Sequence, residues 1–155
     1  MNLYRQFIKT ISTFFYLGYL PWVPGTFGSL GGVLLFYLFK DSRVAYGLVT
    51  GLVIILGFLF SGEAEKIFKA KDHKCIVIDE VSGMLLSLLF LPYDIRLVIA
   101  AFLIFRILDI FKPYPAGRLE NLKAGLGVMS DDIVAGIYTN IILQVLVRLA
   151  SCKAS

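Results

Sequence analysis

The chain has 155 residues, of which 58% are hydrophobic and 17% are charged, and its mean hydropathy is +0.81. An ordinary globular domain is close to half apolar and a quarter charged, so this composition is typical of a membrane protein of one domain, residues 1–155. The net charge of +4 does not indicate a nucleic-acid-binding protein, because the basic residues flank apolar segments and form no aromatic-interleaved patch.

The N-terminal segment, residues 1–23, carries Arg5 and Lys9 around a moderately apolar middle. Prolines and a tryptophan follow where a cleaved signal peptide would need small residues. We therefore expect an interfacial helix that Tyr19 and Trp22 anchor at the membrane surface.

The next motif, PGTFGSL at residues 24–30, places Gly25 and Gly28 ahead of an apolar helix. Exposed backbone N–H groups at such a helix start can bind an anion, and Thr26 and Ser29 offer hydroxyl donors for a phosphate. A plain turn with a helix N-cap explains the motif equally well.

The clearest candidate for a membrane span is the uncharged stretch 44–60. As a helix it would be about 25 Å long, close to the thickness of the bilayer core. Gly47 and Gly51 form a GxxxG pair in it, which we expect to make a close helix contact within the bundle rather than a dimer seam.

The other apolar runs, at residues 28–39, 81–91, 97–105 and 133–147, are shorter than the roughly 20 residues that a span normally requires. To cross a membrane they must include their polar flanks, and charged side chains at membrane depth are usually functional. The sequence therefore predicts an all-α fold, a small polytopic membrane helical bundle over residues 24–150 with short or broken helices.

The motif VIDEVSGM opens the second of these runs with two acids, Asp79 and Glu80. Asp79 lies one helical turn before Gly83, a residue that lets another backbone or a ligand come close. The alternative is structural, since acids at a helix N-terminus also stabilise the helix dipole.

The motif SDDIVAG repeats this pattern, with Asp131 and Asp132 at an expected helix start and Asp132 one turn before Gly136. Here Ser130 could be a simple N-cap.

The stretch FRILDIFKPYP places Arg106, Asp109 and Lys112 three residues apart, near one another on a helix face. The two cations could hold a phosphate, arginine through a bidentate fork and lysine as a point charge. The alternative is an ion pair between Arg106 and Asp109 with a snorkelling Lys112.

The tight turns at residues 40–43 and 92–96 predict that all four motifs lie together at the opposite end of the bundle. That end also carries most of the basic residues, which makes it cytoplasmic by the positive-inside rule. Five carboxylates gathered there require a cation, and oxygen ligands without histidine or cysteine favour Mg²⁺ or Mn²⁺.

The motifs PGTFGSL, IDEVSGM, FRILDIFKPYP and GVMSDDIVAG, in this order in a small membrane chain, closely resemble the phosphatidylglycerophosphatase A family. The resemblance implies a Mg²⁺-dependent phosphatase that converts phosphatidylglycerophosphate into phosphatidylglycerol. It also implies a multi-pass protein of the bacterial inner membrane with its active site facing the cytoplasm. The expected metal ligands and catalytic residues are Asp79, Glu80, Asp109, Asp131 and Asp132, and the expected phosphate-binding residues are Arg106, Lys112, Thr26 and Ser29.

Two other classes of function stay open at this stage. A cation-coupled membrane carrier would also bury acids among membrane helices, but the sequence shows no inverted repeat. A metal-dependent lipid phosphotransferase would usually carry a DGxxAR signature, which DDIVAG does not match. The expected partners are the phospholipid substrate and the membrane, with no nucleic acid, and a homo-oligomer also stays open.

Overall fold

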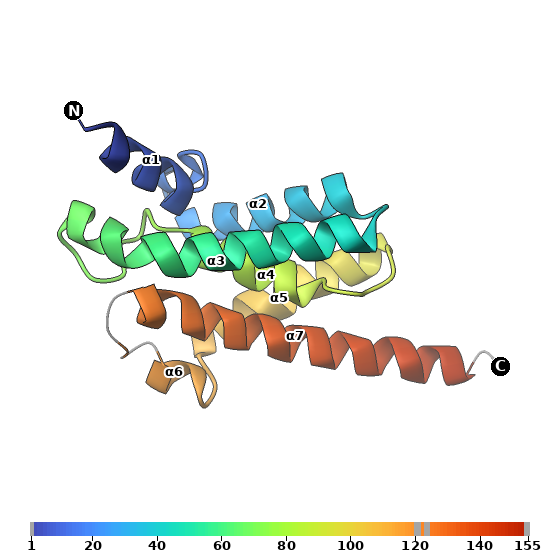
Figure 1. The fold of residues 1–155 in the computed structure, drawn as a ribbon. Helices are drawn as coiled ribbons and strands as arrows, with labels where there is room; N and C mark the ends of the chain where they lie inside the picture. Colours follow the sequence, from blue (N-terminus) through green and yellow to red (C-terminus); the bar gives the residue numbers. More distant parts are fainter. Residues whose placement is uncertain (1, 120–121, 123–124, 154–155) are drawn as a thin grey trace.

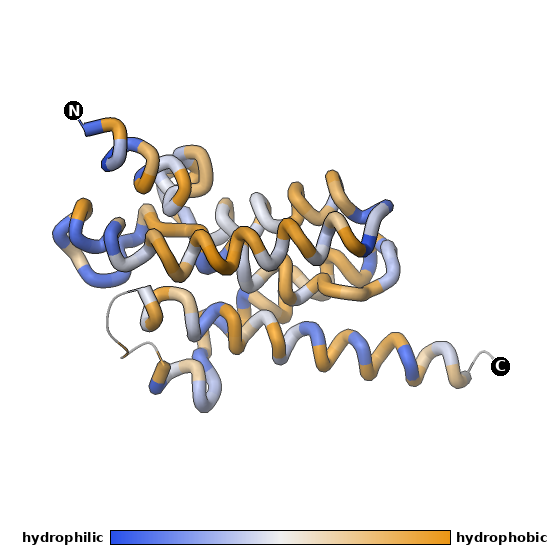
Figure 2. Tube along the Cα trace, viewed as in Figure 1, coloured by the Kyte–Doolittle hydropathy of each residue, from blue (hydrophilic) through white to orange (hydrophobic). Residues whose placement is uncertain are grey.

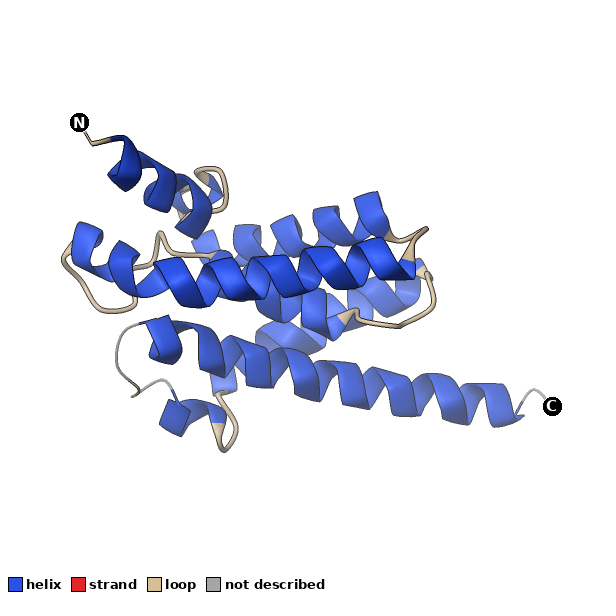
Figure 3. Cartoon of the chain, in the orientation of Figure 1, coloured by secondary structure: helices blue, strands red, loops and turns tan. Residues whose placement is uncertain are grey.

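The structure is a computed structural model that describes residues 2–119, 122 and 125–153. Every regular element among these residues is helical, which confirms the all-α prediction (Figures 1 and 3). The elements are α1 (Leu3–Ser12), η1 (Leu17–Tyr19, a 3₁₀ helix), α2 (Pro24–Phe39), α3 (Arg43–Phe68), α4 (Ile78–Ser87), α5 (Ile95–Phe111), α6 (Ala116–Leu119) and α7 (Gly125–Lys153).

Local capping residues set several helix ends. The side chains of Ser42 and Asp94 accept hydrogen bonds from backbone N–H groups in the first turns of α3 and α5, which satisfies donors that have no partner within the helix. Lys69 and Lys112 end the same two helices in the left-handed conformation, with φ of 56° and 46°.

The short helix α4 lies at the centre of the bundle, packed against α2, α3, α5 and α7 (Figure 1). Eight of its ten residues are buried, and its Met84 and Leu85 belong to the main apolar core together with Phe105 of α5. Ten helical residues extend only about 15 Å. Helix α4 is therefore one of the predicted short helices and reaches only about halfway across a bilayer core.

Side chains of the long helices satisfy the backbone carbonyl groups at the C-terminal end of α4. Asn140 Nδ2 donates to the Ser87 and Leu89 carbonyl oxygens at 3.2 and 2.8 Å, and the Tyr46 hydroxyl donates to the Leu85 carbonyl oxygen at 2.6 Å. Buried carbonyl groups without partners would be costly in an apolar environment. These bonds allow α4 to end inside the bundle.

The two predicted tight turns lie together at one end of the bundle (Figure 1). Lys40 Nζ, in the turn after α2, lies 4.5 Å from the ring centroid of Tyr93, in the loop before α5. Figure 2 shows hydrophilic residues at this end and at the opposite end of α3, with mostly apolar residues along α3 between them. The bundle therefore has two polar ends, as the sequence predicted.

Two helices begin earlier than expected. Helix α2 starts at Pro24, a residue favoured at the first helical position, so PGTFGSL lies inside the helix and not ahead of it. Helix α7 starts at Gly125, so Ser130 is not its N-cap and the two acids that follow lie about two turns inside the helix. Gly125 packs against the backbone of Gly62 in α3, a tertiary contact that the local sequence does not reveal.

The predicted span at residues 44–60 is part of the 26-residue helix α3, and α3 and α7 are the two described helices long and apolar enough to cross a membrane. The expectation for its GxxxG pair was wrong. A Cβ built on Gly47 or Gly51 would meet no described atom within 4 Å. The pair therefore faces away from the bundle, and the glycine of α3 that packs tightly is Gly57, against Met129 of α7.

The N-terminal segment forms α1 and η1, and α1 packs against α3. Tyr19 and Trp22 are exposed, Trp22 almost completely. Their exposure leaves them available as anchors, and an interfacial location of this segment stays a prediction.

Candidate active site

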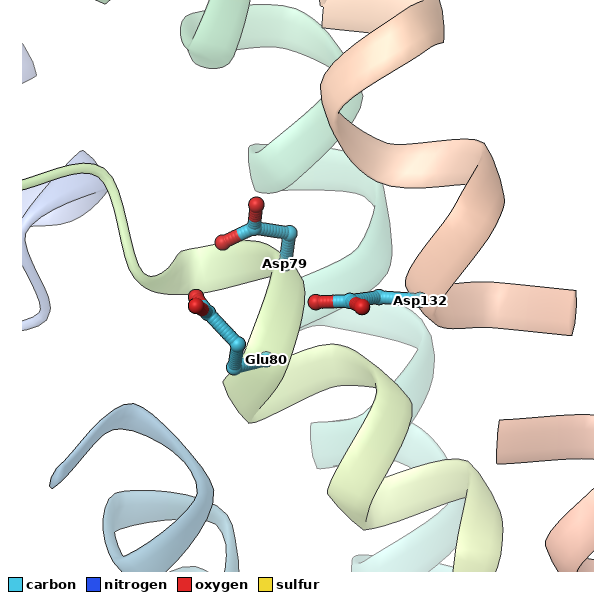
Figure 4. A group of neighbouring side chains, drawn as sticks. All are labelled: Asp79, Glu80 and Asp132. Atoms are coloured by element: carbon cyan, nitrogen blue, oxygen red, sulfur yellow. The ribbon is translucent and has the colours of Figure 1, made fainter. Parts of the chain in front are cut away.

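Three acidic side chains from α4 and α7 lie close together (Figure 4), and the starts of these two helices lie away from the tight turns (Figure 1). Asp79 and Glu80 lie in the first turn of α4, and Asp132 projects from α7 toward them. One carboxylate oxygen from each lies within 4.8 Å of the other two. Asp79 and Asp132 are only 6% and 3% exposed. We call these three residues the acid triad.

Two glycines allow the helices that carry the acid triad to approach one another closely. A Cβ on Gly136 would overlap the carbonyl oxygen of Gly83, and a Cβ on Gly83 would lie 2.7 Å from the carbonyl oxygen of Asp132. Asp79 and Asp132 each precede their glycine by one helical turn. The prediction that another backbone comes close at Gly83 is therefore confirmed, and that backbone belongs to α7.

The acid triad is electrostatically unfavourable without a positive charge. Asp79 Oδ1, Glu80 Oε2 and Asp132 Oδ1 are buried and have no hydrogen-bond partner among the described residues. The three carboxylates lie close together and two of them are almost fully buried, so like charges would repel one another with little water to screen them. Such a group is stable only if it binds protons or a cation.

Arg106 and Asp109 of α5 form an ion pair beside the acid triad. Arg106 Nη1 donates to Asp109 Oδ2 at 2.6 Å, and their side chains are 20% and 15% exposed. A Cβ on Gly25 would lie 3.2 Å from Arg106 Nη1 and would overlap Glu80 Oε1. The missing side chain at Gly25 therefore leaves room for Arg106 and Glu80 to lie next to each other.

A second ion pair joins the end of α5 to α7. Lys112 Nζ donates to Asp131 Oδ2 at 2.7 Å, and these residues are 19 positions apart in sequence. The side chain of Asp131 is 8% exposed, and its Oδ1 has no hydrogen-bond partner among the described residues. Lys112 therefore points toward Asp131 of α7. The structure does not show the alternative, in which Lys112 only snorkels outward.

The two hydroxyl residues of the first motif lie on α2. Ser29 is fully buried, and its hydroxyl donates to the Gly25 carbonyl oxygen at 3.0 Å. Thr26 is partly exposed in the first turn of α2. Among the described residues, neither hydroxyl forms a hydrogen bond with the acid triad, and their role in phosphate binding stays a prediction.

Residues 10–147 match the family model of Phosphatidylglycerophosphatase A. The chain belongs to the phosphatidylglycerophosphatase A family. The matched range contains all four sequence motifs, so the resemblance based on those motifs is confirmed.

Individual relatives agree with this assignment. The chain is 42% identical over 126 residues to phosphatidylglycerophosphatase A of Escherichia coli (strain K12), and this alignment covers 79% of this chain and 73% of that protein. It is 32% identical over 140 residues to phosphatidylglycerophosphatase A of Haemophilus influenzae, with 88% and 86% covered. A Bacteroides thetaiotaomicron protein, whose name proposes a phosphatidylinositol-3-phosphatase, is 37% identical over 146 residues, with 87% and 90% covered. No solved structure matches the chain significantly.

In this member of the phosphatidylglycerophosphatase A family, the five predicted carboxylates divide into two groups. Asp79, Glu80 and Asp132 form the acid triad. Asp109 instead forms an ion pair with Arg106, and Asp131 forms one with Lys112. Asp109 is still near enough to Glu80 and Asp132 for its charge to act on both. The oxygens of the acid triad can therefore bind a metal ion, while Asp109 and Asp131 orient the side chains of Arg106 and Lys112.

The sequence indicated Gly25 only as part of a helix start that could bind an anion, and its place beside Glu80 and Arg106 was not predicted. Its signal was present, because Gly25, Gly28 and Gly32 follow a helical spacing and all three face α4. Recognising it would have required placing PGTFGSL inside the helix.

Proposed function

We propose that this chain hydrolyses the phosphate monoester of phosphatidylglycerophosphate, releasing phosphatidylglycerol and inorganic phosphate, and that it requires Mg²⁺ to do so. The observation that carries the proposal is the acid triad, whose buried oxygens have no partner among the described residues and which lies beside two ion-paired cations. Membership of the phosphatidylglycerophosphatase A family and the names of the E. coli and H. influenzae relatives support the choice of headgroup.

The acid triad fits Mg²⁺, a hard cation that prefers oxygen ligands and commonly joins one or two carboxylates to substrate phosphate and water. Asp79, Glu80 and Asp132 would hold it, each with one carboxylate oxygen. When bound, Mg²⁺ supplies positive charge to the phosphate oxygens and lowers the pKa of a bound water.

In this proposal the side chains of Arg106 and Lys112 bind the substrate phosphate. Arg106 uses Nη1 for Asp109, and the remaining N–H groups of a guanidinium can contact two phosphate oxygens. Lys112 adds a point charge, and Asp131 fixes its direction. Water supplies the oxygen that bonds to phosphorus as the ester bond from phosphorus to the lipid oxygen breaks. One water proton ends on the lipid hydroxyl and the other on the released phosphate.

The site would lie at the cytoplasmic face of a bacterial inner membrane, in a multi-pass protein. Helices α3 and α7 have the length and composition of membrane spans. The site end carries Arg5, Lys9, Lys66, Lys69, Lys71, Lys74, Lys112 and Arg118, and the turn end carries Lys40, Arg43, Arg96 and Arg148. The excess of basic residues at the site end supports this orientation through the positive-inside rule.

Phosphate release from the purified protein in detergent micelles tests the proposed function directly. With phosphatidylglycerophosphate as substrate, activity should rise with Mg²⁺ and disappear with a chelator. Asp132→Asn should lower activity by more than about 100-fold. Even replacing a residue that hydrogen-bonds to a metal ligand typically lowers metal affinity or activity by about 10–100-fold. Phosphatidylinositol 3-phosphate should be a poorer substrate. Full activity in the chelator, or preference for the inositol lipid, would contradict the proposal.

A further inference from the structure

An apolar cavity of about 260 Å³ lies between α2 and α3. Leu35 and Phe39 of α2, Val49 and Val53 of α3 and Ile78 of α4 are among the residues that line it. All the residues that line it are aliphatic or phenylalanine. The cavity therefore offers no partner to a headgroup, a water cluster or an ion, and fits a hydrocarbon.

The place of the cavity relative to the acid triad matches the shape of a phospholipid. Ile78, which lines the cavity, directly precedes Asp79 in the first turn of α4, so the cavity reaches the helical turn that carries Asp79 and Glu80. On α2, Gly25 lies beside Glu80, and Leu35 follows ten residues later, or about 15 Å along the helix axis. A lipid whose phosphate reaches the acid triad would have its chains at this depth.

The segment after α1 shapes the cavity without filling it. Phe14 and Phe15 line it, and the ring of Phe14 occupies the space that a side chain at Gly31 would need. Phe14, Phe15 and Tyr16 all have positive φ, at 44°, 55° and 68°, a conformation that costs free energy in residues with side chains. Because protein interiors are normally close-packed, an apolar space kept open beside two such phenylalanines points to an occupant.

We propose that this cavity binds one acyl chain of the phospholipid substrate while its phosphate lies at the acid triad; the inference rests on the proposed function. The volume lies just below the range of about 300–1,000 Å³ for pockets that enclose a whole small ligand, which suits a stretch of a single chain. Leu35, Val49 and Val53 are partly exposed, so a chain can enter sideways from the bilayer.

The first test fills the cavity. Val53→Phe and Leu35→Phe should lower kcat/KM for long-chain phosphatidylglycerophosphate about tenfold, a typical effect of altered fit in an apolar pocket. They should leave a dihexanoyl analogue with the same headgroup nearly unaffected. Leu52→Phe and Leu34→Phe are matched controls, because these neighbours are 55% and 56% exposed and do not line the cavity. An unchanged ratio of long-chain to short-chain kcat/KM in the filled variants would overturn the proposal.

The second test needs no turnover and therefore separates this inference from the proposed function. A phosphatidylglycerophosphate with a diazirine in the middle of one acyl chain should label residues 35–39 and 49–56 of the wild-type protein after irradiation. Unlabelled long-chain phosphatidylglycerophosphate should displace the label, and phosphatidylcholine should not. Equal displacement by both lipids would show a site for bulk lipid and refute the inference. Specific labelling without phosphate release would support it while contradicting the proposed function.

Discussion

At the scale of single residues, carboxylates that look equivalent in the sequence have different surroundings. Asp131 and Asp132 are adjacent, yet Asp132 belongs to the acid triad and Asp131 binds Lys112. A buried ion pair is weak evidence for stability, because removing its charges from water costs as much as their attraction returns. We therefore expect the pair of Lys112 with Asp131 to serve phosphate binding more than folding.

If Asp131 orients Lys112, replacing it should have a different effect from replacing a proposed metal ligand such as Asp132. Asp131→Asn should raise the KM for phosphatidylglycerophosphate by about 10-fold, since Lys112 loses the charge that orients it, and should leave the Mg²⁺ concentration for half-maximal activity nearly unchanged. Asp132→Asn should instead shift or abolish the Mg²⁺ response. Titration of Mg²⁺ at saturating lipid, with thermal stability recorded for each variant, distinguishes the two.

A double-mutant cycle tests whether the ion pair of Arg106 with Asp109 is only structural or whether Arg106 also binds phosphate. If it is only structural, Asp109→Asn and Arg106→Gln should each lower stability, and the double variant should recover part of it because no charge is left unpaired. If Arg106 binds phosphate, activity should stay low in the double variant whatever its stability. Recovery of activity together with stability would remove Arg106 from the proposed site.

At the scale of elements, the site depends on how α4 is held. The helix is too short to cross a bilayer, and Tyr46 and Asn140 satisfy its terminal carbonyl groups from neighbouring helices. Gly83 and Gly136 then bring its first turn against α7. The positions of Asp79 and Asp132 relative to each other therefore follow from one backbone contact.

Gly136→Ala tests that contact. The added methyl group would overlap the Gly83 backbone, so α7 must move away from α4, at a cost of about 1–3 kcal/mol in stability. A displacement of about 1 Å at the site could lower activity by about 100-fold. Thermal unfolding in detergent and phosphate release measure the two effects.

Gly47→Ala is the matched control for that substitution. A Cβ at Gly47 meets no described atom within 4 Å, and alanine favours a helix over glycine by up to about 1 kcal/mol. The control should therefore keep full activity and equal or higher stability. Similar losses in the two variants would contradict the role given to the contact between α4 and α7.

At the scale of the whole molecule, the two polar ends of the bundle differ in chemistry. One end holds the acid triad and most of the basic residues, and the other holds the two tight turns, joined by the contact of Lys40 with Tyr93. Such an arrangement suits an enzyme that receives a lipid headgroup at one membrane surface and leaves the acyl chains among its helices.

Cysteine labelling in intact bacterial cells tests this orientation. In a background with Cys75→Ser and Cys152→Ser, Lys71→Cys at the site end should react with an impermeant thiol reagent only after the membrane is opened. Asp41→Cys, in the exposed turn after α2, should react from outside. Labelling in the reverse pattern would place the site on the outer surface.

The sequence by itself determined the helical membrane class, the order of the four motifs and the residue types of the site, because composition, apolar runs and helical spacing are local properties. It also predicted the two turns at one end, since a short connection leaves no room to cross back. Only the tertiary structure decided that Asp132 joins Asp79 while Asp131 binds Lys112, that α7 begins before its acids, and that Gly47 and Gly51 face outward. These features depend on how α4, α5 and α7 pack, and packing between residues far apart in sequence follows no local pattern.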